Sequence, residues 1–223
     1  MALSDFTIYK SDAGLTAGLY TTAPIAGAAS LRMNQGTNPV TKRINMVRNV
    51  APEGFTSGRV RYRFGVLTAE ASVDIFMGVC FQQSQENLTG GAGTAYGVML
   101  NPTGGTNEYA LVVIRLSAGL TNSPTILGTS SAFILTPGAA NAQAFEISWE
   151  LQTAPPVEMR FLVKRGTATD FSDLITMLDF VSSTTVLQTT VGEGPALVLR
   201  TTFSSPGDYL WDTMSAVPLT LGG

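Results

Sequence analysis

Carboxylates are the main candidates for catalysis or metal binding in this chain, because the sequence contains no histidine and a single cysteine, Cys80. A Ser-His-Asp or Cys-His nucleophilic site needs histidine, so both are excluded, and so are histidine-based metal sites. No GxxxxGK[ST] phosphate-binding loop occurs. One cysteine cannot form an internal disulfide, and Cys80 lies in an apolar run, which predicts a buried small hydrophobe.

The spacing of the carboxylates argues against a catalytic pair. Glu146 and Glu150 are expected on one face of a strand, where four residue steps separate them by about 13 Å. A glycosidase needs two carboxylates roughly 5–10 Å apart. Asp170 and Asp173 are better explained as caps of a short helix over 170–175, since aspartate at a helix start accepts amide hydrogens. We therefore expect no enzymatic activity, no catalytic residue, no metal and no cofactor.

Basic residues form the sharpest surface feature. Arg59, Arg61 and Arg63 alternate with apolar residues, which places three cations in a row at intervals of about 6.6 Å along a strand. This row could contact acidic side chains of a neighbouring protein, together with Lys42 and Arg43, or it could pair with acidic residues of its own sheet. Nucleic acid would demand aromatic platforms or a stronger basic charge, so we expect no nucleic-acid partner.

The charge is unevenly distributed along the chain. Residues 1–63 carry eight basic and three acidic groups, and the remainder carries five basic and thirteen acidic groups, for a net charge of −3. Such polarity suits head-to-tail contacts between copies, so a homo-oligomer is expected. The alternative is that the strands fold together and mix these charges on one surface.

Aromatic residues could also bind a sugar. Tyr96 and Trp211 are candidate glycan contacts, if their rings are exposed beside polar groups. Both alternate along the sequence like core residues, so packing in the interior is the default interpretation.

Hydrophobic periodicity indicates that strands must position these residues. Apolar and polar residues alternate with a period of two, or form short apolar runs, over 59–64, 73–81, 109–116, 145–151, 159–164, 197–203 and 209–217. Weaker candidates lie at 30–34, 43–48, 96–100 and 125–128. Glycine- and proline-rich turns separate them, so the pattern predicts an all-β protein, an antiparallel β-sandwich or barrel.

The chain divides into three segments on composition. Residues 1–28 are rich in small residues and are expected to form an extended N-terminal arm, or else a peripheral strand after a disordered start. Residues 29–219 form the β-sandwich domain, and 220–223 a frayed tail. The start lacks the basic and apolar regions of a signal peptide, and no apolar stretch has membrane-spanning length, so we expect no membrane partner.

The order of segments over residues 57–217 resembles the concanavalin A-like lectin/glucanase (laminin G-like) jelly roll. SGRVRYRFGVL, VDIFMGVCF, YGVMLNP and EYALVVIRL are followed by PTILG, then by the pair AFEISWEL and EMRFLVKRG, and finally by GPALVL and YLWDTMSAV. The resemblance implies that Asp212 is the aspartate of the closing strand. The catalytic carboxylate signature of the glucanases and the metal loop of the legume lectins are absent.

Domains of this kind resemble accessory structural proteins of tailed bacteriophages. The expectation is therefore a non-enzymatic virion protein, made in the host cytoplasm, a capsid decoration or tail component that contacts other virion proteins. The alternative is a lectin-like module that binds a surface glycan, and a third is a glycan-cleaving enzyme.

Overall fold

The protein is described by a computed structural model over residues 6–10, 14–35, 42–48, 57–68, 74–80, 95–116, 124–152, 158–168, 170–182, 196–203 and 207–218. In strands β4, β6 and β14 the description covers the backbone and not the side chains.

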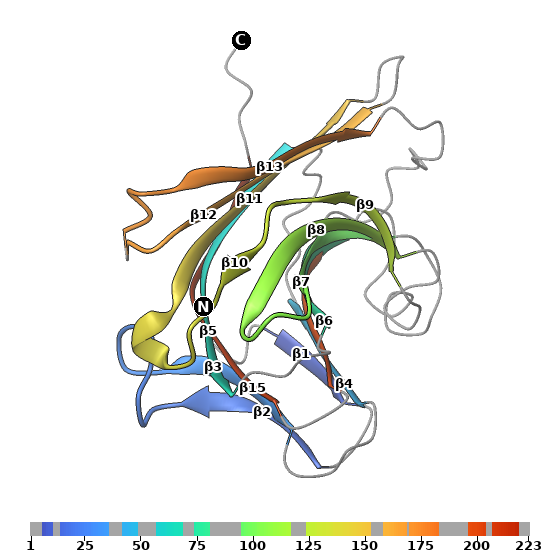
Figure 1. The fold of residues 1–223 in the computed structure, drawn as a ribbon. Coiled ribbons are helices and arrows are strands. Elements are labelled where there is room, and N and C mark those ends of the chain that lie inside the picture. Colours follow the sequence, from blue (N-terminus) through green and yellow to red (C-terminus); the bar gives the residue numbers. More distant parts are fainter. Residues whose placement is uncertain are drawn as a thin grey trace.

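The chain folds into two stacked antiparallel sheets, as the two-residue periodicity predicts. The seven-stranded sheet has the order β13-β12-β11-β5-β15-β3-β2 and runs from the top to the bottom of Figure 1. Its strands are β2 (Leu15–Tyr20), β3 (Ser30–Gln35), β5 (Ser57–Thr68), β11 (Gln143–Gln152), β12 (Glu158–Gly166), β13 (Ile175–Ser182) and β15 (Gly207–Pro218).

The second sheet has eight strands, in the order β1-β4-β14-β6-β7-β8-β10, with β9 also paired to β8. These strands are β1 (Phe6–Lys10), β4 (Lys42–Arg48), β6 (Asp74–Cys80), β7 (Ala95–Pro102), β8 (Glu108–Leu116), β9 (Thr125–Thr129), β10 (Phe133–Ile134) and β14 (Ala196–Phe203). A single 3-10 turn, η2 (Ala139–Asn141), lies within the described residues. Together these elements confirm the all-β antiparallel sandwich and each of the predicted strands.

The N-terminal segment is not an arm where it is described. β1 pairs with β4 in one sheet and β2 pairs with β3 in the other, and Leu15 is fully buried. Since β1 and β2 are the edge strands of their sheets, the alternative of a peripheral strand describes this segment better than an extended arm. The tail 220–223 lies outside the described residues.

Two further strands had no signal in the sequence analysis. β10 is two residues long, and β13 begins where a helix was expected over 170–175. Residues 170–173 form a turn that leads directly into β13. The expected helix is therefore wrong: Asp170 and Asp173 accept amide hydrogens, as a cap would, but they close a loop between two strands.

The core lies between the sheets and takes alternate residues of strands such as β5, β8 and β11. Val60, Tyr62 and Phe64 of β5 point into it, and Phe64 contacts Trp211 edge to face with ring centroids 5.1 Å apart. Tyr62 stacks on Phe145 at 5.4 Å. Such ring pairs add about 0.5–1.5 kcal/mol beyond the burial of their area, so β15, β5 and β11 form the rigid centre of the seven-stranded sheet.

No helix of the described residues is long and apolar enough to cross a bilayer.

A glycine at the start of β5 makes room for the core. A Cβ placed on Gly58 would lie 2.1 Å from Cζ2 of Trp149, whose side chain is 3% exposed. Gly58→Ala should therefore lower the free energy of unfolding by about 2 kcal/mol, the usual cost of overpacking a core, as measured by urea unfolding. Gly18→Ala in β2, where nothing lies within 4 Å of the added Cβ, is the control. Equal stability of the two variants would contradict this packing.

Candidate functional site

The outer face of the seven-stranded sheet, turned away from the other sheet, carries the charged residues. On β5 the alternation that sends Val60, Tyr62 and Phe64 inward sends Arg59, Arg61 and Arg63 outward. Glu146 of β11 lies directly across from Arg61, and Lys164 of β12 lies directly across from Glu146. Residues from three adjacent strands therefore meet on this face.

These residues form what we call the Glu146 cluster: Glu146 with Arg59, Arg61 and Lys164. Nε of Arg61 donates to Oε2 of Glu146 at 2.6 Å, Nζ of Lys164 lies 3.3 Å from Oε1, and Nε of Arg59 lies 3.9 Å from Oε2. The carboxylate is 4% exposed, whereas each cation is about one-third exposed. Three cations thus share one buried carboxylate. The sequence interpretation of pairing within the sheet holds for Glu146, and Glu150 is not part of this cluster.

The electrostatics of the cluster keep Glu146 ionised. Burial acts to raise the pKa of its carboxyl, but hydrogen bonds from Arg61 and Lys164 outweigh that effect and bring the pKa below its ordinary value. A carboxyl group held in this way has no proton to give near neutral pH. Glu146 is therefore suited to positioning Arg61 rather than to acid catalysis.

Removing this carboxylate should destabilise the sheet. Glu146→Gln leaves three neighbouring cations without their counter-charge; breaking a fully buried pair costs about 3–5 kcal/mol, and partial exposure of the cations reduces the expected loss to about 2 kcal/mol. The free energy of unfolding in urea at pH 7 measures it. Asp179→Asn, which breaks the exposed Arg160–Asp179 pair on the same sheet, should have a much smaller effect; the reverse order would contradict the assignment.

A loop between β2 and β3, residues 21–29, lies over the outer face. The buried Ser30 hydroxyl accepts from the amide of Ile25 at 2.8 Å and donates to Oδ2 of Asp212 at 2.6 Å. The same oxygen accepts from the amide of Ala26 at 3.0 Å. Gly27 has a φ of 64° and open space around it. Asp212, which the resemblance placed in the closing strand, thus anchors this loop.

A turn between β12 and β13, described at residues 167–168 and 170–174, lies over the same face. Asp173 accepts hydrogen bonds from the amide and hydroxyl of Thr167, both at 2.7 Å, and from the amide of Ala168 at 2.8 Å. A Cβ at Gly166 would collide with Asp173, so glycine is required where β12 enters the turn. Figure 1 shows the blue 21–29 loop and the orange turn on the same side of the sheet.

The turn holds Phe171 in an unfavourable backbone conformation. Its φ is 63°, a region that bulky residues rarely adopt and that costs of order 1–3 kcal/mol. The ring lies over the Arg61 guanidinium, with Cζ 5.6 Å from the ring centroid. Residues with such strain concentrate at functional sites, and here the strain places an aromatic ring against the Glu146 cluster.

The Asp173 contacts make the turn pH-dependent. Hydrogen bonds from the side chain and amide of Thr167 and from the amide of Ala168 lower the pKa of Asp173 to about 2, against about 3.9 in an unfolded chain. The stabilisation is complete above the unfolded value and is lost as the pH falls from about 4 to about 2. Asp173→Asn should make the free energy of unfolding less dependent on pH over that interval in urea titrations. Thr167→Val should act in the same direction and more weakly; an unchanged slope in both variants would refute the contact.

Between the loop and the turn the outer face is hollowed. The hollow has a volume of about 610 Å³, within the ~300–1,000 Å³ of ligand sites. It lies at a β-bulge of β15 between Asp212 and Ser215, a feature often found beside active sites. Its lining comes from β2, β3, β5, β15, the loop and the turn: Leu19, Ala26, Gly27, Ala28, Ala29, Leu31, Arg61, Phe171, Trp211, Asp212 and Ser215.

The predicted assembly residues are only partly placed together. Arg59 and Arg61 belong to the Glu146 cluster. Arg63 was expected at the surface but is 5% exposed, because the 21–29 loop and η2 cover its end of β5, and its Nη2 donates to the carbonyl of Ala142 at 3.3 Å. Lys42 and Arg43 are in β4 of the other sheet, and their side chains lie outside the described residues.

The predicted glycan contacts do not form a site. The Trp211 side chain is fully buried against Phe64, so it is no exposed platform and the packing interpretation describes it. Tyr96 lies in β7 of the other sheet, and its side chain is outside the described residues, as is that of Cys80.

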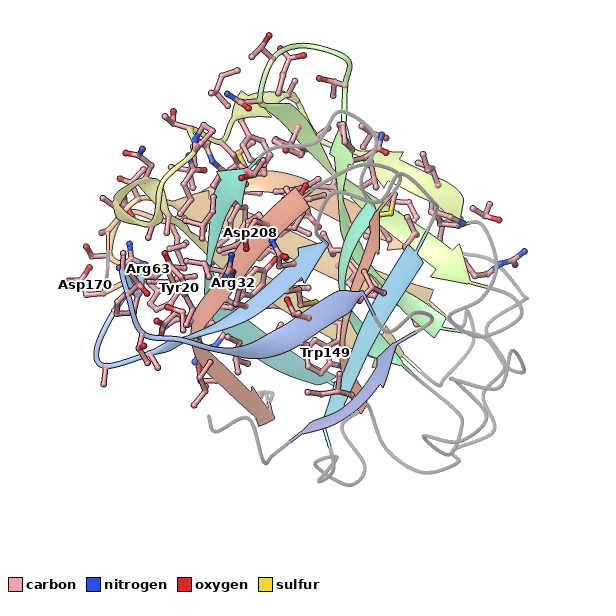
Figure 2. All side chains as sticks on the ribbon, turned by 90° about the horizontal axis from the view of Figure 1, so that it is seen from below. Tyr20, Arg32, Arg63, Trp149, Asp170 and Asp208 are labelled. Carbon is pink, nitrogen blue, oxygen red and sulfur yellow. The ribbon has the colours of Figure 1, made fainter. Side chains whose placement is uncertain are left out.

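The sequence analysis did not indicate Phe171 or the 21–29 loop as parts of a site, although the run Ala26–Ala29 of small residues was a signal for a close approach of the backbone. Another outer-face contact joins Arg32 and Asp208, whose Nη2 and Oδ2 atoms lie 2.5 Å apart. Figure 2 shows the two side chains.

Comparison with known proteins identifies the architecture. No protein-family model and no curated protein sequence matches the chain. The exoplasmic domain of VIP36 in its Ca²⁺/Man3GlcNAc-bound form is similar, with a TM-score of 0.59, 9% identity, and coverage of 99% of this chain and 86% of that one. The fold is that of the concanavalin A-like lectins. An endo-β-1,4-glucuronan lyase from the fungus Trichoderma reesei has a TM-score of 0.59, 10% identity, and coverage of 98% and 93%. A legume lectin-like domain from Entamoeba histolytica has a TM-score of 0.55, 7% identity, and coverage of 98% and 92%.

These similarities correct the first functional expectation. The similar structures include sugar-bound and lectin-like domains and a glycan lyase, so the expected bacteriophage virion protein is wrong and the glycan-binding alternative is favoured. Among the residues described here, no group of three or more carboxylate or cysteine side chains comes together to hold a metal ion, so no role is derived for a metal.

Proposed function

We propose that the chain is a glycan-binding module whose site is the hollow on the outer face of the seven-stranded sheet. The hollow carries the proposal because it combines an aromatic ring, Phe171, with charged groups and with backbone that small side chains leave accessible. A sugar presents an apolar face suited to a ring and hydroxyls suited to polar groups. Concave sites with a few placed polar groups are the usual ligand sites of proteins.

The fold supports the same proposal. VIP36 is described with mannose-containing sugars bound, and Emp46p has a domain described as a carbohydrate recognition domain. The coverage of both chains is high, so the comparison concerns the whole sandwich rather than a fragment. The likeness concerns the fold, and the function is inferred from the fold together with the hollow.

Binding without cleavage fits the charged groups better than a lyase or hydrolase activity. Glu146 is a low-pKa carboxylate buried behind Arg61, and Oδ2 of Asp212 is occupied by Ser30 and Ala26. Both carboxylates thus hold parts of the site in place. Incubation with a panel of polysaccharides should release no shorter products, and release that is lost in Glu146→Gln or Asp212→Asn would overturn this part of the proposal.

Phe171 should be the main apolar contact. Phe171→Ala should weaken binding of the best ligand from a glycan array by at least about tenfold, since truncating a central aromatic anchor costs about 2 kcal/mol or more. Calorimetric titration of the purified protein measures it. Ile126→Ala is the matched control, because Ile126 is 51% exposed and lies on β9 of the other sheet. Equal affinities of the two variants, or no glycan bound by the unaltered protein, would contradict the site.

A further inference from the structure

We propose that the glycan bound in the hollow is acidic, a chain of uronic acids or another carboxylated sugar, and that Arg61 binds its carboxylate. This inference rests on the proposed function and specifies its ligand. It is carried by the charges that meet behind the wall of the hollow, where cations outnumber the carboxylates available to them.

The excess of positive charge is local. In the Glu146 cluster, side-chain nitrogen atoms of three cations lie within 4 Å of a single carboxylate. The hydrogen bond to Asp179 raises the pKa of Arg160 most, and Glu150, the next outward carboxylate of β11, lies directly across from Arg160 and adds to that effect. Glu150 therefore belongs to a separate group and does not neutralise the cluster.

Arg63 adds to this excess. Its guanidinium is buried, and among the described residues neither Nε nor Nη1 has a hydrogen-bond acceptor. Asp212 lies directly across from it on β15, but Oδ2 of that carboxylate is bound by Ser30 and Ala26. Arg63 and Asp212 together with the Glu146 cluster make four cations and two carboxylates. Cations partly shielded from water act over several ångströms, so this face favours an anionic ligand.

Arg61 is the residue positioned to meet that ligand. It lines the hollow, its side chain is 34% exposed, and its Nε is already bound to Glu146. The Phe171 ring lies over its guanidinium, so both the position and the orientation of the group are set before a ligand arrives. A guanidinium held in this way binds carboxylates in a fork geometry, at a lower entropic cost than a free side chain.

The acidic residues near the hollow keep their negative charge, but their oxygens are hydrogen-bonded within the loop and the turn. Asp212 is the one carboxylate in the lining, and it is engaged by the loop. Asp173 is bound to Thr167 and Ala168, and Asp170 accepts from the amide of Ser172. Each serves to fix the loop or the turn, so Arg61 is the charged group of the lining that has donors for a ligand.

The test compares two oligosaccharides that differ only in the group at C5: a β-1,4-linked glucuronate hexamer, with a carboxylate there, and cellohexaose, which has the same backbone with a hydroxymethyl group. Calorimetric titrations at low salt should show the acidic hexamer binding about tenfold more tightly, the worth of one charge-assisted hydrogen bond. The preference should shrink as sodium chloride is added. A matched pair of galacturonate and galactose oligomers extends the test to a second linkage and sugar.

Variants assign the preference to residues. Arg61→Gln should abolish the preference for the acidic sugar, and Lys164→Gln, which leaves the lining intact, should reduce it by about threefold through the weaker field. Arg160→Gln, on the same face but paired with Asp179, should leave it unchanged. Urea unfolding of each variant establishes that it is folded.

The possible failures are distinguishable. Equal or tighter binding of the neutral oligomers would overturn the acidic ligand while leaving the glycan-binding function in place. A preference for acidic sugars that survives in both Arg61→Gln and Lys164→Gln would overturn the assignment to this hollow. Binding of neither charged nor neutral oligomers would overturn this inference, and the proposed function falls with it if the glycan array also yields no ligand.

Discussion

The two-residue period of strand β5 is the constraint on which the rest of the structure depends. One strand supplies aromatic residues to the core on one side and Arg61 to the hollow on the other. The position of Arg61 is therefore fixed by the packing of Tyr62 against Phe145, since the backbone between them cannot shift without moving both. A site built on a strand with a packed inner face is more rigid than one built on loops alone.

In the Glu146 cluster three cations surround one carboxylate, rather than each cation having an acidic partner of its own. Glu146 binds Arg61 and Lys164 and lies near Arg59, so one buried carboxylate holds three strands in register. A cluster of this kind contributes modestly to stability, because burying the carboxylate offsets much of the attraction. Its consequence is positional: the Arg61 guanidinium is held at one place in the wall of the hollow.

The loop and the turn complete the site from opposite directions. Both are fixed by single aspartates that accept several hydrogen bonds: Asp212 holds the 21–29 loop, and Asp173 holds the turn that carries Phe171. The strained φ of Phe171 is maintained by these contacts and by its position over Arg61. Segments without regular structure thus gain defined positions from the sheet beneath them, which is how a sandwich fold can present a specific binding surface.

Hydrophobic alternation in the sequence was enough to determine the strands that form the core and the face of β5 that carries the arginines, because a period of two is a local property of each strand. The edge strands β1, β2 and β13 were missed or assigned otherwise, because one-sided or weak burial leaves little pattern, as the exposed Ile175 and Val181 of β13 show. Partners distant in the chain were beyond the reach of any local pattern. Only the tertiary structure decided that Ser30 and Asp212, separated by 182 residues, would anchor one loop, that this loop would bury Arg63, and that Phe171 would lie over Arg61 to form a hollow.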